Sequence, residues 1–190
     1  MKKYLLVVVL LVLIVSSCSK KDKYEQWVDH ELASGVRQDS LFLGIGFGMT
    51  SKKFFAHCWE LNKQGVIRQG LGKASVEYRL DDELKYPATM NFYPNFNENT
   101  IYEMPVRFKY EAWAPWNKPL QADSLQLDVL SLMQDWYGEQ FMDVTHPIHG
   151  TAYIRVDGNR QISIFKKDEA EVMVMFTDLT VEKDDEEADE

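Results

Sequence analysis

The chain has 190 residues and is acidic, with 21 basic and 30 acidic side chains and a formal net charge of −9. Nucleic-acid-binding domains need a basic surface, so this balance of charge argues against a nucleic-acid partner. The length suits one domain or two small units that share a core.

The first segment, residues 1–17, has the pattern of a secretory signal peptide. Lys2 and Lys3 precede an unbroken run of Leu, Val and Ile over residues 5–15. A membrane-spanning helix needs about 20 apolar residues, whereas the apolar part of a signal peptide has about 7–15. Ser16 and Ser17 then supply the small residues of a cleavage site.

The stretch Val15-Ser16-Ser17-Cys18 resembles the lipobox of bacterial lipoproteins, with Val in place of the commoner Leu. The resemblance implies cleavage before Cys18, attachment of lipid (palmitate among the acyl chains) to its thiol, and a place in the cell envelope, at the outer membrane facing the periplasm. Residues 18–23 would then be the lipid anchor and a polar tether. The alternative is an ordinary secretory signal with an incidental cysteine.

Two helices are predicted in the next part of the chain. Tyr24–Ala33 has a weak apolar stripe and is followed by Ser34-Gly35. Thr50 is a good N-cap for a helix over 51–64, and Gly65 is placed to end it. The apolar residues at helical spacing in this second helix are Phe54, Phe55, Cys58, Trp59 and Leu61. Cys58, which would be the only thiol left after lipidation of Cys18, is expected to be buried and inert in this company, with a reactive thiol as the alternative.

The segment "LGIGFGMTSKKFF", residues 43–55, resembles the "GMT" and following helix that open small lipoproteins of the BamE (SmpA/OmlA) type. It is also similar to the helix-plus-sheet repeats of β-lactamase inhibitor proteins. The resemblance implies a helix-and-sheet fold and an assembly or inhibitor role without catalysis. It carries over Gly48, Met49 and Thr50 as structural positions only.

After residue 65 the apolar period changes to two, which indicates strands. Strands are predicted at Ala74–Leu80, Ala88–Tyr93 and Ile101–Ala112. In the last of these, one face is apolar and the other is charged, as in an antiparallel strand with one face in water. Pro105 lacks an N–H, so this strand is expected at a sheet edge or with a bulge.

The segment "WAPWNKPLQ" interrupts the pattern and leads to a second half. Asp123 or Ser124 is expected to cap a helix that ends at Gly138, and three further strands are expected at Thr151–Val156, Arg160–Phe165 and Glu171–Asp178. The sequence therefore predicts an α+β domain over 24–181, with an antiparallel sheet and helices packed on one face. The element order suggests two helix-plus-three-strand units, 39–113 and 119–179.

The last nine residues, 182–190, hold seven acids and one lysine, "EKDDEEADE". A block of like charge has no apolar face, so this tail is predicted to be disordered. It could be an interaction tail or a solvated end that aids solubility.

The sequence contains no recognisable motif for catalysis or for nucleotide binding. There is no Gly-x-Ser-x-Gly, phosphate loop or zincin motif. His146 and His149, with Asp143 as a distant third ligand, could share a metal, but Pro147 between them favours a surface turn. We therefore expect no enzyme activity, no metal and no cofactor.

The candidate functional surface is aromatic, since exposed aromatic residues often mark partner sites. Four residues near two loops form it: Tyr93, Phe96, Trp113 and Trp116. The alternative is that they cover the core. The leading hypothesis is a lipid-anchored cell-envelope protein that acts as a non-catalytic protein-interaction or assembly module with an envelope protein partner. The alternative is a lipoprotein that binds a small molecule or envelope polymer in a concave sheet face.

Overall fold

A computed structural model describes residues 22–70, 75–146 and 150–181. The predicted signal peptide, Cys18, most of the tether, His149 and the acidic tail lie outside the described residues. The helical elements are α2 (Lys23–Ala33), α3 (Ser51–Lys63), a 3-10 turn η1 (Lys118–Leu120) and α4 (Ala122–Tyr137). The strands are β1 (Arg68–Gln69), β2 (Val76–Leu80), β3 (Ala88–Phe92), β4 (Asn95–Asn97), β5 (Thr100–Tyr110), β6 (Met142–His146), β7 (Gly150–Asp157), β8 (Arg160–Lys166) and β9 (Glu171–Asp178).

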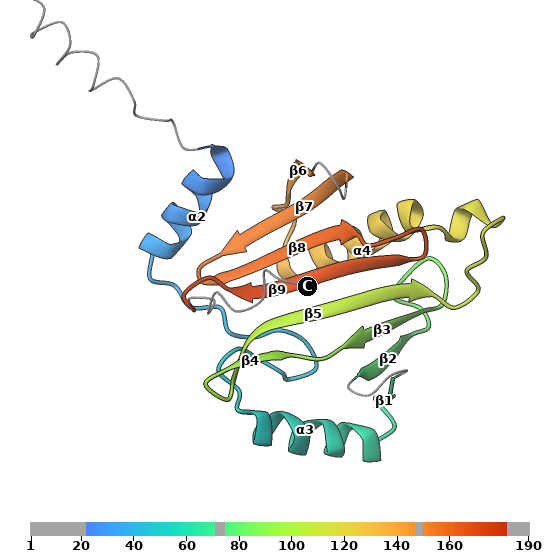
Figure 1. Cartoon of the computed structure of the whole chain (residues 1–190), viewed down its shortest axis with the longest axis horizontal. Coiled ribbons are helices and arrows are strands. Elements are labelled where there is room, and N and C mark those ends of the chain that lie inside the picture. The colour runs from blue at the N-terminus through green and yellow to red at the C-terminus, as the bar shows by residue number, and fades with distance from the viewer. Residues whose placement is uncertain (1–21, 71–74, 147–149, 182–190) are drawn as a thin grey trace, which may run out of the picture.

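The strands form one antiparallel sheet in the order β1-β2-β3-β5-β9-β8-β7-β6, with β4 paired to β5 (Figure 1). The predicted α+β class with an antiparallel sheet is confirmed. The central pair is β5 and β9, which are the last strands of the two predicted units and align Val106 with Val174. The two predicted units therefore contribute to a single continuous sheet.

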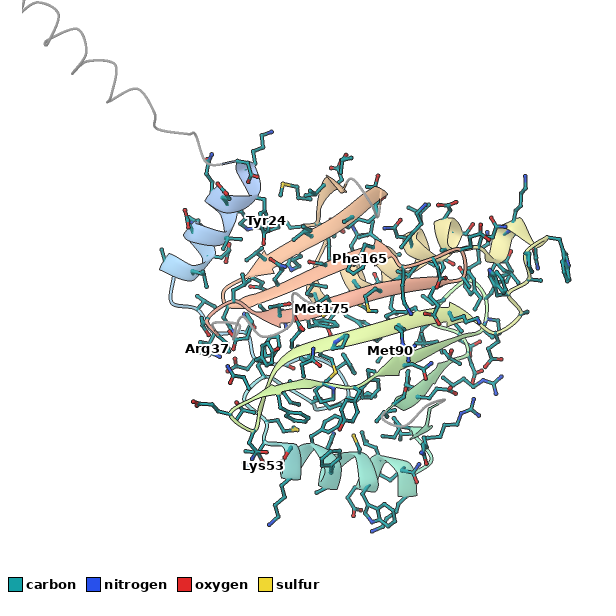
Figure 2. All side chains as sticks on the ribbon, in the orientation of Figure 1. Tyr24, Arg37, Lys53, Met90, Phe165 and Met175 are labelled. Atoms are coloured by element: carbon teal, nitrogen blue, oxygen red, sulfur yellow. The ribbon has the colours of Figure 1, made fainter. Side chains whose placement is uncertain are left out.

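The helices take different positions around the sheet. Helix α4 packs on one face against β5, β8 and β9, as predicted, and buries Leu125, Val129 and Met133. Helix α2 contacts β7, and its Tyr24 hydroxyl donates to Gln161 Oε1 at 2.5 Å (Figure 2). Because Gln161 alternates with the buried Ile162, α2 reaches the face opposite to α4. Helix α3 lies beside β1 at the far edge of the sheet (Figure 1).

Pro105 is not at an edge, because β5 is paired on both sides. On one side Pro105 faces Met175 of β9. On the other side β3 pairs only up to Phe92, opposite Val106, and β4 begins at Asn95, opposite Glu103, with a register shift between Asn95 and Phe96. The proline therefore lies where the ladder is interrupted, and such a gap tolerates a residue without an N–H.

Other boundaries also differ from the predictions. Helix α4 starts at Ala122, two to three residues earlier than expected, with Gln121 at the N-cap and no side-chain cap, so neither Asp123 nor Ser124 caps it. The short strands β1, β4 and β6 were not predicted. β1 has two residues and β4 has three, too few to show a period of two.

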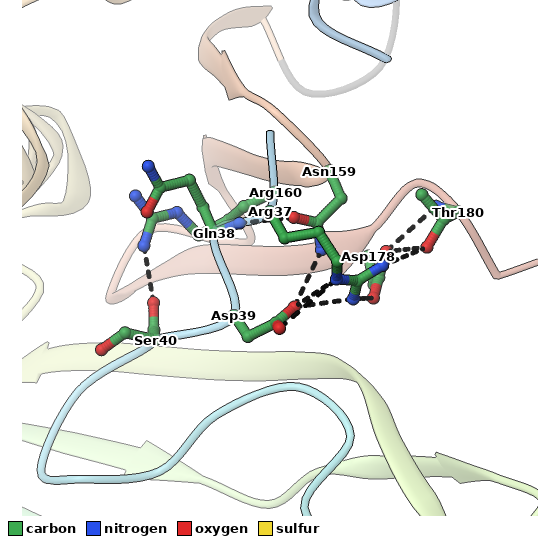
Figure 3. Close-up of polar contacts among 8 residues, drawn as sticks. All are labelled: Arg37, Gln38, Asp39, Ser40, Asn159, Arg160, Asp178 and Thr180. Carbon is green, nitrogen blue, oxygen red and sulfur yellow. Dashed lines mark hydrogen bonds and ion pairs between the residues drawn. The ribbon is translucent and has the colours of Figure 1, made fainter. Parts of the chain in front are cut away.

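A polar cluster fixes the chain that leaves α2, and we call it the Arg37 cluster (Figure 3). The Arg37 guanidinium donates to Asp39 at 2.6 Å and to Asp178 at 2.9 Å. The cluster consists of Arg37, Gln38, Asp39, Ser40, Asn159, Arg160, Asp178 and Thr180. These contacts join residues 37–40 to the ends of β8 and β9, and so fix the start of the apolar segment 41–47 that follows.

Candidate functional site

Helix α3 exposes part of the apolar stripe that the sequence suggested was core. Thr50 is the N-cap, as predicted, and its side chain accepts from the Lys53 N–H. Phe54 is fully buried, but the side chains of Phe55 and Trp59 are 51% and 63% exposed. The helix lies along the sheet edge and has only one face to bury, so Phe55 and Trp59 extend beyond the contact.

Four rings beneath and beside this exposed face form a cluster: Phe54, Phe55, Tyr93 and Phe96. Each ring contacts the other three, with centroid distances between 5.6 and 6.5 Å. Most of these contacts are edge-on, the geometry that aromatic quadrupoles favour. The half-exposed Phe55 is therefore held by packing rather than free to rotate.

An open cavity of about 310 Å³ lies between α3 and the edge of the sheet, and we call it the α3 groove. Its lining combines apolar residues and a polar rim: Phe55, Cys58, Trp59, Asn62, Ile67, Arg68, Gln69, Ser75 and Val76. Asn62 donates to the Ile67 carbonyl at 3.1 Å, which ties the helix to the edge strand. Arg68 Nε donates to Glu77 at 2.6 Å, so this guanidinium is paired at the rim.

Cys58 lines the α3 groove and is half-buried. Burial raises the pKa of its thiol to about 11. The thiolate is the nucleophilic form of cysteine, so this environment keeps Cys58 in its unreactive state at neutral pH. The sequence predicted a buried, inert thiol: Cys58 is half-buried rather than buried, and its raised pKa fits the predicted unreactive state.

The surface of α3 is basic although the chain as a whole is acidic. The helix contains three lysines, Lys52, Lys53 and Lys63, and one acid, Glu60. Lys63 lies over the Trp59 ring at 5.6 Å and pairs with Glu60 at 3.0 Å. A surface with exposed aromatic rings and surrounding lysines is complementary to a partner segment that has apolar residues flanked by acidic ones.

The four predicted surface residues do not form one surface. Tyr93 and Phe96 belong to the ring cluster under α3. Trp113 and Trp116 follow the other end of β5, which at about 3.3 Å per residue is roughly 30 Å away. Trp113 is partly covered: its Nε1 donates to the Glu169 carbonyl at 3.2 Å, and Lys109 lies over its ring. Trp116 is 86% exposed.

Phe55 and Trp59 were missed as site residues, because helical spacing marks a stripe as apolar without showing what it packs on. The sequence held one weak indication of this exposure. Phe54 and Phe55 are adjacent on the helix, so the apolar stripe is too wide for both side chains to be covered by a single contact with the sheet edge.

Neither a metal site nor a membrane-spanning helix occurs in the described part of the chain. Within 22–70, 75–146 and 150–181, no group of three or more His, Cys, Asp or Glu side chains could hold a metal ion. In the same ranges no helix is long and apolar enough to cross a membrane. Comparison of the chain with known protein families, curated proteins and solved structures gives no match.

Proposed function

We propose that the protein is a lipid-anchored cell-envelope protein that acts as a non-catalytic protein-interaction module, and that its partner binds the exposed side of α3 and the α3 groove. The observation that carries the proposal is the pair Phe55 and Trp59. These two large apolar side chains are exposed on one helix, and the ring cluster holds Phe55 in place. Aromatic anchors with little rotational freedom are typical of interface hot spots.

The position of α3 relative to the predicted anchor supports the proposal. Cys18 lies four residues before Asp22, the N-cap of α2, so a tether of this length reaches at most about 15 Å. Helix α2 packs at the β7 side of the sheet and α3 at the β1 edge (Figure 1). Six strand spacings of about 4.8 Å separate β7 from β1, or roughly 29 Å. A lipid on Cys18 would therefore leave α3 at the end far from the membrane.

Helix α2 is also attached well enough to transmit this orientation. Tyr24 bonds Gln161, and the Gly158 N–H donates to Glu31 at 3.0 Å. The Arg37 cluster secures the chain just after the helix. The anchor would thus be coupled to the sheet through three points of contact rather than through a loose linker.

Capture of the full-length protein from solubilised envelopes tests the proposal. Trp59→Ala is expected to weaken a captured complex by at least about 2 kcal/mol, the hot-spot range. The side chain is mostly exposed, so the fold should be retained. Trp116→Ala is the matched control, because it removes an even more exposed indole at the far end of β5.

The outcomes separate the two tryptophan sites. Loss of the same protein with Trp59→Ala but not with Trp116→Ala supports the proposal. Loss with Trp116→Ala alone would move the partner site to the segment after β5. Unchanged capture by both variants would reject a partner at either place.

The alternative, a lipoprotein that binds a small molecule, has a separate observation in its favour. A second cavity lies on the α4 side of the sheet, and its chemistry differs from that of the α3 groove.

A further inference from the structure

A cavity of about 300 Å³ lies on the α4 face of the sheet, beside the end of the helix. We call it the α4 pocket, and its lining is Leu41, Phe42, Leu43, Tyr78, Met90, Trp136 and Tyr137. Helix α4 covers β5, β8 and β9, while Tyr78 and Met90 are cross-strand partners on β2 and β3. The pocket therefore lies beyond the end of α4, where the helix no longer covers the sheet face and residues 41–43 cover it instead.

The lining contains no charged side chain, and its two tyrosine hydroxyls are hydrogen-bonded within the protein. The Tyr137 hydroxyl donates to the Leu41 carbonyl at 2.8 Å, and the Tyr78 hydroxyl donates to Glu83 at 3.0 Å. Burial raises the pKa of the Tyr137 hydroxyl, so it stays neutral. A group that enters the pocket would have to be uncharged and apolar, because a polar group would lose its bonds to water there.

The wall formed by residues 41–43 is preformed. Phe42 packs edge-on to Phe92 at 4.9 Å, and the Leu43 carbonyl lies 2.6 Å from His57 Nε2 of α3. Leu43 itself has a φ of 51°, in the left-handed region that a bulky residue rarely adopts. Such strained residues cluster at binding sites, where the surrounding contacts hold them. In this protein the left-handed conformation of Leu43 places its side chain on the pocket wall.

The volume sets the size of the ligand. An apolar cavity of about 150 Å³ is enough to bind benzene, so about 300 Å³ suits a two-ring aromatic group or the end of an alkyl chain. Among the lining residues, Trp136 is the large apolar side chain with the greatest contact with solvent, and it is only 39% exposed. A protein interface would need about 800 Å² on each partner, far more than this rim supplies.

We propose that the α4 pocket is a binding site for the uncharged hydrophobic group of a small molecule, either a fused aromatic ring pair or an alkyl chain end. The site is separate from the α3 groove: it lies on the sheet face beside the end of α4, whereas the groove lies between α3 and the β1 edge of the sheet.

The test uses the full-length protein in lipid nanodiscs with ¹³C-methyl methionine, so that the Met90 methyl reports on the pocket directly. The probes are 2-naphthol for the aromatic class and 1-octanol for the alkyl class. A saturable shift of the Met90 signal is expected with at least one of them, and the responding probe identifies the class. The charged analogue 2-naphthol-6-sulfonate should give no shift.

Leu43→Asn is the matched variant. Asparagine adopts the left-handed region more readily than leucine, so the midpoint of thermal unfolding should not fall, but a polar amide replaces an apolar wall. The affinity for the responding probe should drop at least tenfold, whereas Trp59→Ala should leave it unchanged. No Met90 shift with either probe, or equal affinity in Leu43→Asn, would overturn the proposal.

Discussion

Phe54 and Phe55 are neighbours on α3 with opposite surroundings. Phe54 is fully buried, while Phe55 is 51% exposed although it shares the same ring cluster. One ring therefore attaches the helix to the sheet edge, and the other presents an apolar surface to solvent.

This difference predicts unequal effects on stability. Phe54→Ala should lower the free energy of unfolding by about 3–5 kcal/mol, because it empties a packed site. Phe55→Ala should cost about 1 kcal/mol or less, since half of the side chain is already in water. Urea unfolding of the two variants measures both values, and equal losses would show that Phe55 is a core residue.

Cys58 gives a second prediction at this scale. Its pKa of about 11 compares with an ordinary value near 9, so the thiolate fraction at pH 8 is about 100-fold lower. Alkylation by iodoacetamide at pH 8 should be about 100-fold slower for the native protein than for the protein in urea. Cys18 would be acylated and silent. A native rate within tenfold of the unfolded rate would contradict the burial of this thiol.

At the scale of elements, the Arg37 cluster links α2 to the strands through Asp178. Burial alone would raise the pKa of Asp178, but hydrogen bonds from Thr180, Asn159 and Arg37 outweigh it and hold the pKa below the ordinary carboxyl value. The charged form is therefore favoured in the folded state.

The sign of the pH effect follows from this direction. A lowered folded-state pKa contributes stability that is present above the unfolded value, near 4, and is lost as the pH falls through the folded value. Asp178→Asn should destabilise the protein at pH 7, and the difference from the wild type should shrink as the pH drops below about 4. Unfolding curves across pH 7 to 2.5 test this, and a constant difference would exclude a charge effect.

Elements were predictable where a period repeats several times. Helix α3 and the strands β5 and β9 have enough residues to show their periodicity, and the sequence identified all three. Strand β1 has two residues, too few to show an alternating pattern of apolar and polar side chains, and only its pairing with β2 identifies it as a strand. The position of Pro105 could not be predicted either, because it depends on a gap between β3 and β4 that only the register creates.

The candidate site was predictable only in part, for a related reason. Tyr93 and Phe96 were identified as aromatic residues near a loop, but their role as a support for Phe55 depends on where α3 packs. Trp113 and Trp116 were grouped with them although the predicted strand Ile101–Ala112 lies between the two pairs and, at about 3.3 Å per residue, holds them apart. The exposure of a side chain on α3 depends on tertiary packing, and the spacing of residues along the helix does not predict it.

At the scale of the whole molecule, the proposal joins an anchor near the β7 side of the sheet to an interaction surface at the β1 edge. The anchor is testable by itself. Cys18→Ala should release the protein from membranes or block its maturation, since the acyl chains would be lost. Fractionation of envelopes measures how much of the variant stays with the membrane. A variant that stays membrane-bound and normally processed would contradict lipid anchoring through Cys18.

The most direct measurement of the central claim is photo-cross-linking in living cells with p-benzoylphenylalanine at position 59 and, as matched exposed controls, at positions 116 and 127. The control sites, Trp116 and Leu127, lie on other elements and are 86% and 57% exposed. We expect a discrete cross-linked protein from position 59 and none from the controls. No product from position 59, or the same product from all three positions, would contradict the assignment of α3 as the partner surface.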